Sequence, residues 1–276
     1  IKVTIDITVP TIEFVSIKSN NKNYDSLAKQ GDRIKLIFKS EEPLEVDNSK
    51  VTIADDSNIS IYQDTNSDLY GDTNSYFYKA EYVVNGDSRE DVVSWVIDVQ
   101  DLAGNENSLA SDSIGDNDDK VTIDITAPTI SISAGKNELK KSETTTISFS
   151  LSEKSTNFTI NSINSTGGEL LNLYSDSNDS NYQLFYTAIF EPNKDTELNG
   201  IIEVKQSEFT DLAGNKNIGS DTIIIKIDTL TPTIEFESIK SNNDNDSLAK
   251  KDDRITLTFK SSELLKVDNS KVKIAD

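Results

Sequence analysis

Hydrophobic and polar residues alternate with a period of two along most of this chain, and no helical period of useful length competes with that pattern. Alternation of this kind predicts β-strands with one buried face. In Val92–Val99, for example, it places Val93, Trp95, Ile97 and Val99 on one side, and we expect Trp95 to be a core residue. We expect strands at Thr11–Ile17, Arg33–Lys39, Lys50–Ala54, Ile59–Gln63, Tyr76–Val84, Val92–Val99 and Lys120–Ile125, and again at Thr129–Ser133, Thr144–Leu151, Phe158–Ile163, Glu169–Tyr174, Tyr182–Phe190, Ile201–Lys205 and Thr222–Ile227.

A repeated motif divides the chain into units. VTIDITAPTI at Val121–Ile130 also occurs as VTIDITVPTI at Val3–Ile12 and as IKIDTLTPTI at Ile225–Ile234. Each copy reads as the last strand of one domain, a short link with a proline, and the first strand of the next domain. Successive link prolines are 118 and 104 residues apart, which is the size of an ordinary single domain.

The third unit resembles the first. Ser26–Asp55 and Ser247–Asp276 agree at 22 of 30 positions. We therefore expect the last strand of a preceding domain at residues 1–8, unit A at 9–126, unit B at 127–229, and the N-terminal half of a further A-type domain, unit A′, at 230–276. On this interpretation the chain is a segment of a longer protein.

Seven short strands in about 100 residues, with polar turns between them, favour an antiparallel sandwich of two sheets. Four motifs recur in a fixed order: the D-x-T-x-P joint, F-x-x-S-E after the second strand, Y-x-A-x-F/Y in the fifth, and D-L-A-G-N before the last. In this respect the chain resembles the bacterial immunoglobulin-like domains of giant repeat adhesins, and unit B fits best. Unit A departs by its longer loops and by Glu41 in place of the serine. The resemblance implies an all-β fold of tandem seven-stranded immunoglobulin-like sandwiches in a linear array, on an extracellular or bacterial cell-surface stalk that is often stiffened by Ca²⁺.

Composition narrows the chemistry. The chain has no Cys and no His, which removes disulfides, Cys–His and Ser–His nucleophile systems and most soft-metal sites. A net charge of −21 makes nucleic acid and anionic lipid poor partners. No apolar run is long enough to insert into a membrane. Clustered carboxylates remain as ligands for a hard cation such as Ca²⁺; the alternative is that they only keep the surface soluble.

The expected fold brings acidic residues together at each joint. Since successive strands alternate in direction, the loops after the second and sixth strands return to the pole where the joint enters. Carboxylates with an amide or backbone oxygens make a reasonable Ca²⁺ shell, although D-L-A-G-N also reads as a simple turn. The expected groups are Asp6, Glu42 (or Glu41), Asp101 and Asn105 entering unit A, Asp124, Glu153, Asp211 and Asn215 entering unit B, and Asp228 with Glu263 entering unit A′.

A second candidate Ca²⁺ loop lies inside unit A. Asp64, Asn66, Asp68 and Asp72 have the spacing of EF-hand positions 1, 3, 5 and 9, and Tyr70 offers a carbonyl at position 7. The loop lacks the Gly at position 6 and the Glu at position 12. A solvated polar loop is the alternative interpretation.

These features predict a mechanical function, a Ca²⁺-stiffened rod that holds a binding region away from a cell. The partners are neighbouring repeats of the same chain, with homotypic contacts between chains as a further possibility. No enzyme is expected, because acidic loops that recur in each unit are untypical of an active site. Two alternatives stay open: a segment of a self-assembling extracellular filament or surface layer, and a glycan- or protein-binding module.

Overall fold

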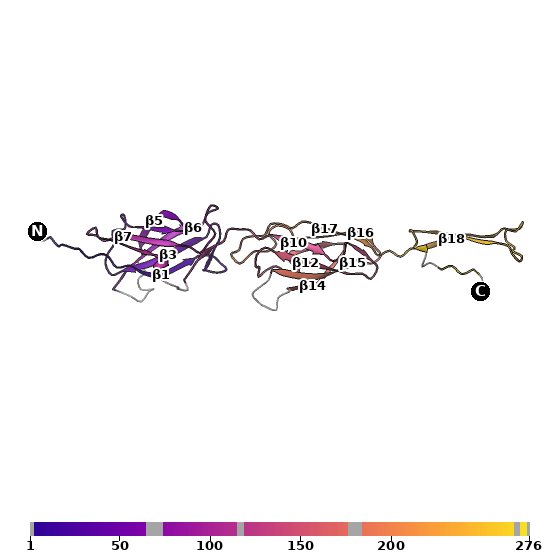
Figure 1. Cartoon of the computed structure of the whole chain (residues 1–276), viewed down its shortest axis with the longest axis horizontal. Coiled ribbons are helices and arrows are strands. Elements are labelled where there is room, and N and C mark those ends of the chain that lie inside the picture. The colour runs from indigo at the N-terminus through magenta and orange to yellow at the C-terminus, as the bar shows by residue number, and fades with distance from the viewer. Residues whose placement is uncertain (1–2, 65–73, 115–118, 176–183, 268–270, 275–276) are drawn as a thin grey trace.

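The protein is an elongated, all-β molecule. The computed structural model describes residues 3–64, 74–114, 119–175, 184–267 and 271–274. Its units follow one another along the long axis, with the N-terminal segment at one end and unit A′ at the other (Figure 1). Named helical elements in this part of the chain are the 3₁₀ turns η2 (Ser111–Ile114) and η3 (Ile160–Ser162). Neither is long or apolar enough to span a bilayer.

Unit A is built on one continuous sheet that curves around a single core. Its order is β1-β3-β6-β5-β4-β7-β8, and a separate parallel pair joins β2 to β9. Strand β5 pairs with both β4 and β6 and so connects the two halves of the sheet. Phe38 of β3 and Ile97 of β7 belong to the same buried cluster. The strands are β1 (Glu13–Ser19), β2 (Leu27–Ala28), β3 (Arg33–Ser40), β4 (Lys50–Ile53), β5 (Asp56–Gln63), β6 (Tyr76–Val83), β7 (Trp95–Gln100), β8 (Glu106–Ala110) and β9 (Thr122–Ile123).

Unit B has two four-stranded sheets, ordered β10-β12-β15-β14 and β11-β17-β16-β13. Phe149 and Phe190 of the first sheet share one buried cluster with Ile202 and Ile225 of the second, so the core lies between the sheets. The strands are β10 (Ile130–Ala134), β11 (Glu138–Lys140), β12 (Thr145–Leu151), β13 (Asn164–Thr166), β14 (Gly168–Ser175), β15 (Phe185–Pro192), β16 (Glu197–Glu203) and β17 (Ile223–Asp228).

In Val92–Val99 the alternation correctly predicted which side chains are buried. Trp95 is 3% exposed and stacks on Phe14 with ring centroids 5.0 Å apart. The alternation of hydrophobic and polar residues does not show, however, where the chain passes from one sheet to the other. After β1 and after β10 the chain turns and adds a short parallel strand, β2 or β11, to the final strand of its unit. The expected strand Lys120–Ile125 is thereby paired as a strand only at Thr122–Ile123, since β2 has only two residues.

One expected strand is wrong. Phe158–Ile163 forms a turn that contains η3, and the neighbouring strand is β13. Serine side chains in and just before this segment bond the local backbone: Ser155 Oγ accepts from Asn157 N, and Ser162 Oγ accepts from Thr159 N. Such local bonds compete with a strand ladder. Phe158 is still buried, in contact with Phe149, Tyr186 and Phe209.

The two ends of the chain present exposed apolar residues. The leading segment, expected to be a strand, has no strand partner among the described residues, and Val3, Ile5 and Ile7 are each more than 80% exposed. In unit A′ the named strands form the antiparallel hairpin β18 (Ile234–Ser241) and β19 (Ile255–Ser261). Their register matches that of β1 and β3, including the bulge.

Candidate metal centre

Three separate segments bring carboxylates together where unit A meets unit B. Asp124 directly follows β9, Glu153 lies just after β12, and Asp211 lies in the turn between β16 and β17. One oxygen from each of these three side chains lies within 4.8 Å of the others. We call this group the second joint cluster.

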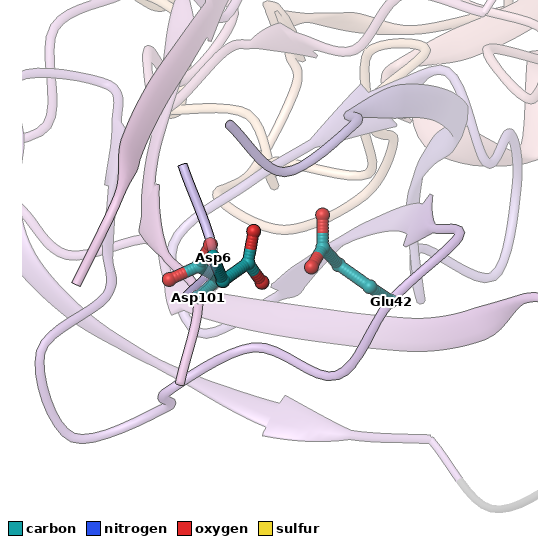
Figure 2. Close-up of side chains that lie close together, drawn as sticks. All are labelled: Asp6, Glu42 and Asp101. Carbon is teal, nitrogen blue, oxygen red and sulfur yellow. The ribbon is translucent and has the colours of Figure 1, made fainter. Parts of the chain in front are cut away.

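An equivalent first joint cluster lies at the other end of unit A. Asp6 comes from the leading segment, Glu42 from the turn after β3, and Asp101 from the turn between β7 and β8. Their oxygens also lie within 4.8 Å of one another. Glu42 points toward the pair formed by Asp6 and Asp101 (Figure 2). The same three loops therefore contribute in both units.

The donor set fits a calcium ion. Ca²⁺ takes carboxylate and carbonyl oxygens at about 2.4 Å, so two oxygens on one ion are at most about 4.8 Å apart. Both clusters meet that limit. Three carboxylates are fewer than the six to eight oxygens that Ca²⁺ prefers, and bidentate binding, backbone carbonyls and water commonly supply the remainder.

The D-L-A-G-N turn fixes one carboxylate of each cluster. Asp211 is 2% exposed, and its Oδ1 accepts hydrogen bonds from Gly214 N at 2.7 Å and from Asn215 N at 2.8 Å. Asp101 is held in the same way by backbone N–H groups. Gly214 has a φ of +90°, which a side chain at Cβ disfavours. The turn is thus stable in its own right, and it also orients an acid.

Asn105 and Asn215 were expected as Ca²⁺ ligands, and in the structure their side chains donate hydrogen bonds to the acidic residues. The Asn215 Nδ2 group donates to Asp211 Oδ2 at 2.9 Å and to the Asp124 carbonyl at 2.9 Å. Asn105 Nδ2 donates to Asp101 Oδ2 at 2.8 Å and to the Asp6 carbonyl at 3.4 Å. Their amide nitrogens, which cannot bind a cation, face the carboxylates. In this geometry the asparagines position the acidic residues.

The second joint cluster is electrostatically costly. Burial, followed by the charges of Asp124, Asp211 and Glu90, raises the pKa of Glu153 to about 7. Burial and the charge of Asp211 raise the pKa of Asp124 to about 6. A bound cation would favour the ionised forms of both groups.

The first joint cluster is more open. Burial and the charges of Asp101 and Asp6 raise the pKa of Glu42, whereas the hydrogen bond from Asn105 lowers the pKa of Asp101. The two clusters differ in burial because unit A packs beside the second joint cluster, whereas only the exposed leading segment enters the first joint cluster.

Glu90 was missed by the sequence analysis. It lies between β6 and β7, and its Oε1 accepts hydrogen bonds from Ile125 N at 2.8 Å and from Thr126 Oγ1 at 2.7 Å. It therefore holds the link and adds negative charge near the second joint cluster. Glu90 lies in the sequence SREDV, which belongs to none of the repeated motifs. The motifs that predicted the joint clusters therefore did not point to this residue.

The other predicted ligands that the structure describes are not brought together. Asp228 is exposed and Glu263 is half-buried, and no group of three carboxylates among the described residues includes either. Asp64 is 7% exposed, and its backbone N donates to the Phe77 carbonyl. The other members of that candidate loop lie outside the described residues, namely Asn66, Asp68, Tyr70 and Asp72.

Comparison with known proteins shows similarity to solved structures and a match to one family model. The FdeC adhesin of Escherichia coli is 11% identical, with a TM-score of 0.37, over 92% of this chain and 76% of that chain. The ectodomain of mouse nectin-like molecule 4 is 8% identical, with a TM-score of 0.30, over 80% of this chain and 64% of that chain. Curated protein sequences gave no significant match. Residues 124–227, which run from the joint residue Asp124 to Ile227 in β17, match the family model of the bacterial Ig-like domain.

Proposed function

We propose that this chain is part of the stalk of a large bacterial surface or secreted adhesin, in which tandem seven-stranded Ig-like sandwiches form a rod and Ca²⁺ binds at the joints. The observation that carries the proposal is the recurrence of the same three-carboxylate group at two successive joints. A site that recurs with the domain repeat suits a mechanical function shared by every unit.

The second joint cluster connects two units. Asp124 belongs to unit A, where its backbone N donates to the Ala28 carbonyl at 2.9 Å. Glu153 and Asp211 belong to unit B. An ion bound by all three would tie the last strand of one unit to two loops of the next. Asp124, Glu153 and Asp211 would hold it, and Ca²⁺ would supply the positive charge that offsets their mutual repulsion.

An extracellular location suits this chemistry. Weak Ca²⁺ sites stay filled where the concentration of the ion is well above their Kd, and binding then stabilises the folded unit by mass action. The proposal therefore places the rod outside the cell, where it would project a binding region.

A glycan- or protein-binding module would need an exposed aromatic platform. Tyr174 and Phe185, on the neighbouring strands β14 and β15, are 62% and 57% exposed. In contrast, Tyr78, Phe38, Phe149 and Phe190 are buried. Among the described residues, buried aromatic side chains outnumber exposed ones, which favours the stalk. Carbohydrate-induced NMR shifts confined to Tyr174 and Phe185 would instead support the module.

Thermal unfolding of the full chain with Ca²⁺ and with chelator tests the proposal. Ca²⁺ should raise the Tm of unit B in the wild type, and Asp124→Asn combined with Asp211→Asn should remove that shift of unit B. Asp221→Asn, an exposed residue of the same unit, is the matched control. An undiminished Ca²⁺ shift in the double variant would overturn the joint site. Small-angle scattering should show an elongated monomer, and growth of the particle with concentration would favour the filament alternative.

A further inference from the structure

Two side-chain amides of unit A donate hydrogen bonds to the D-L-A-G-N turn of unit B. The Asn21 amide, in the turn between β1 and β2, donates from Nδ2 to the Ala213 carbonyl at 2.8 Å. Asn23 Nδ2 donates to the Leu212 carbonyl at 3.2 Å. A Cβ placed on Gly214 would lie 3.3 Å from Asn23 Nδ2 and 3.4 Å from the Lys29 side chain. Neutral amides and backbone carbonyls make these contacts, so neither calcium nor ordinary changes of pH control them directly.

The contact with unit A buries part of the D-L-A-G-N turn of unit B, whereas the same turn of unit A is exposed. Ala213 is 0% exposed in unit B, whereas its counterpart Ala103 in unit A is exposed. Leu102 is 68% exposed, and its counterpart Leu212 is partly buried. The two turns have the same sequence, and in both the aspartate carboxylate accepts hydrogen bonds from backbone N–H groups of its own turn. The difference therefore comes from the docking of the Asn21 turn.

The turn that contains Asn21 is stabilised by hydrogen bonds within unit A. The second Asn21 N–H donates to Asp32 Oδ2 at 2.6 Å, and Asn21 Oδ1 accepts from Asn23 N at 2.9 Å. The Asn21 amide is thereby held on both sides, and one N–H points at the next unit. Such a preorganised donor loses little freedom on docking.

Unit A′ repeats this construction. Asn243 Nδ2 donates to Asp253 Oδ2 at 2.9 Å, and Asn243 Oδ1 accepts from Asn245 N at 3.2 Å. Lys250 N donates to Asp253 Oδ2, as Lys29 N does to Asp32 Oδ2. The turn thus keeps its shape where it contacts no D-L-A-G-N turn within the described residues. Unit B departs from the pattern, because its corresponding turn has the sequence Gly135-Lys136-Asn137 and is held by Thr145.

We propose that Asn21 and Asn23 form a metal-independent latch that sets the angle between unit A and unit B, and that the latch is a property of A-type units, whose partner is the D-L-A-G-N turn of the unit that follows. This goes beyond the metal proposal. Calcium would strengthen the joint against unfolding, whereas the latch fixes its orientation even when the ion is removed.

Electron–electron distance measurements in chelator test the latch. The chain has no Cys, so Ser60→Cys in unit A and Ser148→Cys in unit B, both exposed, give a unique pair of spin labels on the full chain. The wild type should show a narrow distance distribution without Ca²⁺. Asn23→Ala, and more strongly Asn21→Ala with Asn23→Ala, should broaden and shift it.

Asn243→Ala with Asn245→Ala is the matched control, because it removes the same bonds within a turn that contacts no second unit among the described residues. It should leave the distribution unchanged. Unaltered melting of unit A, which carries both substitutions, would show that the latch variants remain folded, and Asn23→Ala leaves the Asn21–Asp32 bond in place should the double variant unfold. A wild-type distribution that is already broad in chelator, or latch variants as narrow as the wild type, would overturn the latch. Either result would leave the calcium proposal standing, since that proposal depends on the Ca²⁺ shift of Tm.

Discussion

Replacing Glu153 by glutamine should stabilise the calcium-free protein and weaken its response to Ca²⁺. The Glu153 carboxylate is crowded by Asp124, Asp211 and Glu90, and burial and these charges raise its pKa from the usual 4.5 to about 7. At pH 8 the folded chain must hold this group ionised. Glutamine keeps the shape of the side chain and removes the charge, so the repulsion disappears together with one cation ligand.

The size of the effect follows from the pKa. A rise from 4.5 to about 7 corresponds to a cost of about 3 kcal/mol for the ionised group in the folded state. Because Glu153 is only half-buried, solvent screening reduces this cost to about 1–2 kcal/mol. In a domain of about 100 residues, each kcal/mol shifts the Tm by about 4–8 °C. Unit B of Glu153→Gln should therefore melt about 4–16 °C higher than the wild type in chelator at pH 8.

The sign of the pH dependence provides a second check. The folded chain binds the Glu153 proton more tightly than the unfolded chain, so the calcium-free wild type should gain stability as the pH falls from about 7 to 4.5. Below that range both states are protonated, and the advantage of the variant should vanish. Differential scanning calorimetry at pH 8 and pH 4.5 measures both effects.

The control is Glu169→Gln, an exposed position on β14 of the same unit, which should leave the Tm within about 2 °C of the wild type, as is usual for surface changes. A Glu153→Gln protein that melts at or below the wild type in chelator would refute the charge-repulsion argument. A full Ca²⁺ shift in that variant would remove Glu153 from the set of ligands.

Three further outcomes are expected. Asn217→Ala should destabilise unit B by about 2–4 kcal/mol in denaturant titrations, because this fully buried amide bonds Phe209 N and the Lys205 and Ile218 carbonyls; a loss below about 1 kcal/mol would contradict this. Phe158→Ala should cost about 3–5 kcal/mol, since its ring is 5% exposed and contacts three aromatic side chains; a nearly neutral change would show that the site collapses. Ca²⁺ affinity measured by calorimetry should fall at least about tenfold between pH 8 and pH 5.5, because protons compete for the groups with pKa values near 6 and 7; an affinity independent of pH would argue against these ligands.

The alternation of hydrophobic residues was enough to place most strands and the core, because burial on one face of a strand fixes the period directly. It could not show that the first strand of each unit divides between sheets, since β2 and β11 are only two and three residues long. It also misread Phe158–Ile163, whose pattern is strand-like but whose Ser162 side chain bonds the local backbone. Apolar spacing carries no information about such bonds.

The joint clusters could be anticipated because their members lie at fixed places in a repeated fold. Asp124, Glu153 and Asp211 each follow a recognisable motif, and strand direction alone brings the loops to one pole. Glu90 and Asn21 could not be found in this way. Asn21 bonds a carbonyl of the next unit, and the charge of Glu90 raises the pKa of Glu153 in the next unit, so both depend on how two units are placed, which no pattern within a single unit encodes.

The latch and the second joint cluster act on one turn. Asn21 and Asn23 hold the Leu212 and Ala213 carbonyls, and the adjacent residue Asp211 supplies a carboxylate to the cluster. Docking therefore places a candidate ligand and also buries the cluster. The same burial raises the cost of the unneutralised charges and strengthens their attraction for a cation. At the first cluster only the leading segment lies on the other side of the joint, and Leu102 is exposed. If Ca²⁺ binds as proposed, a joint of this kind should attain its full affinity for the ion only when both of its units are in place.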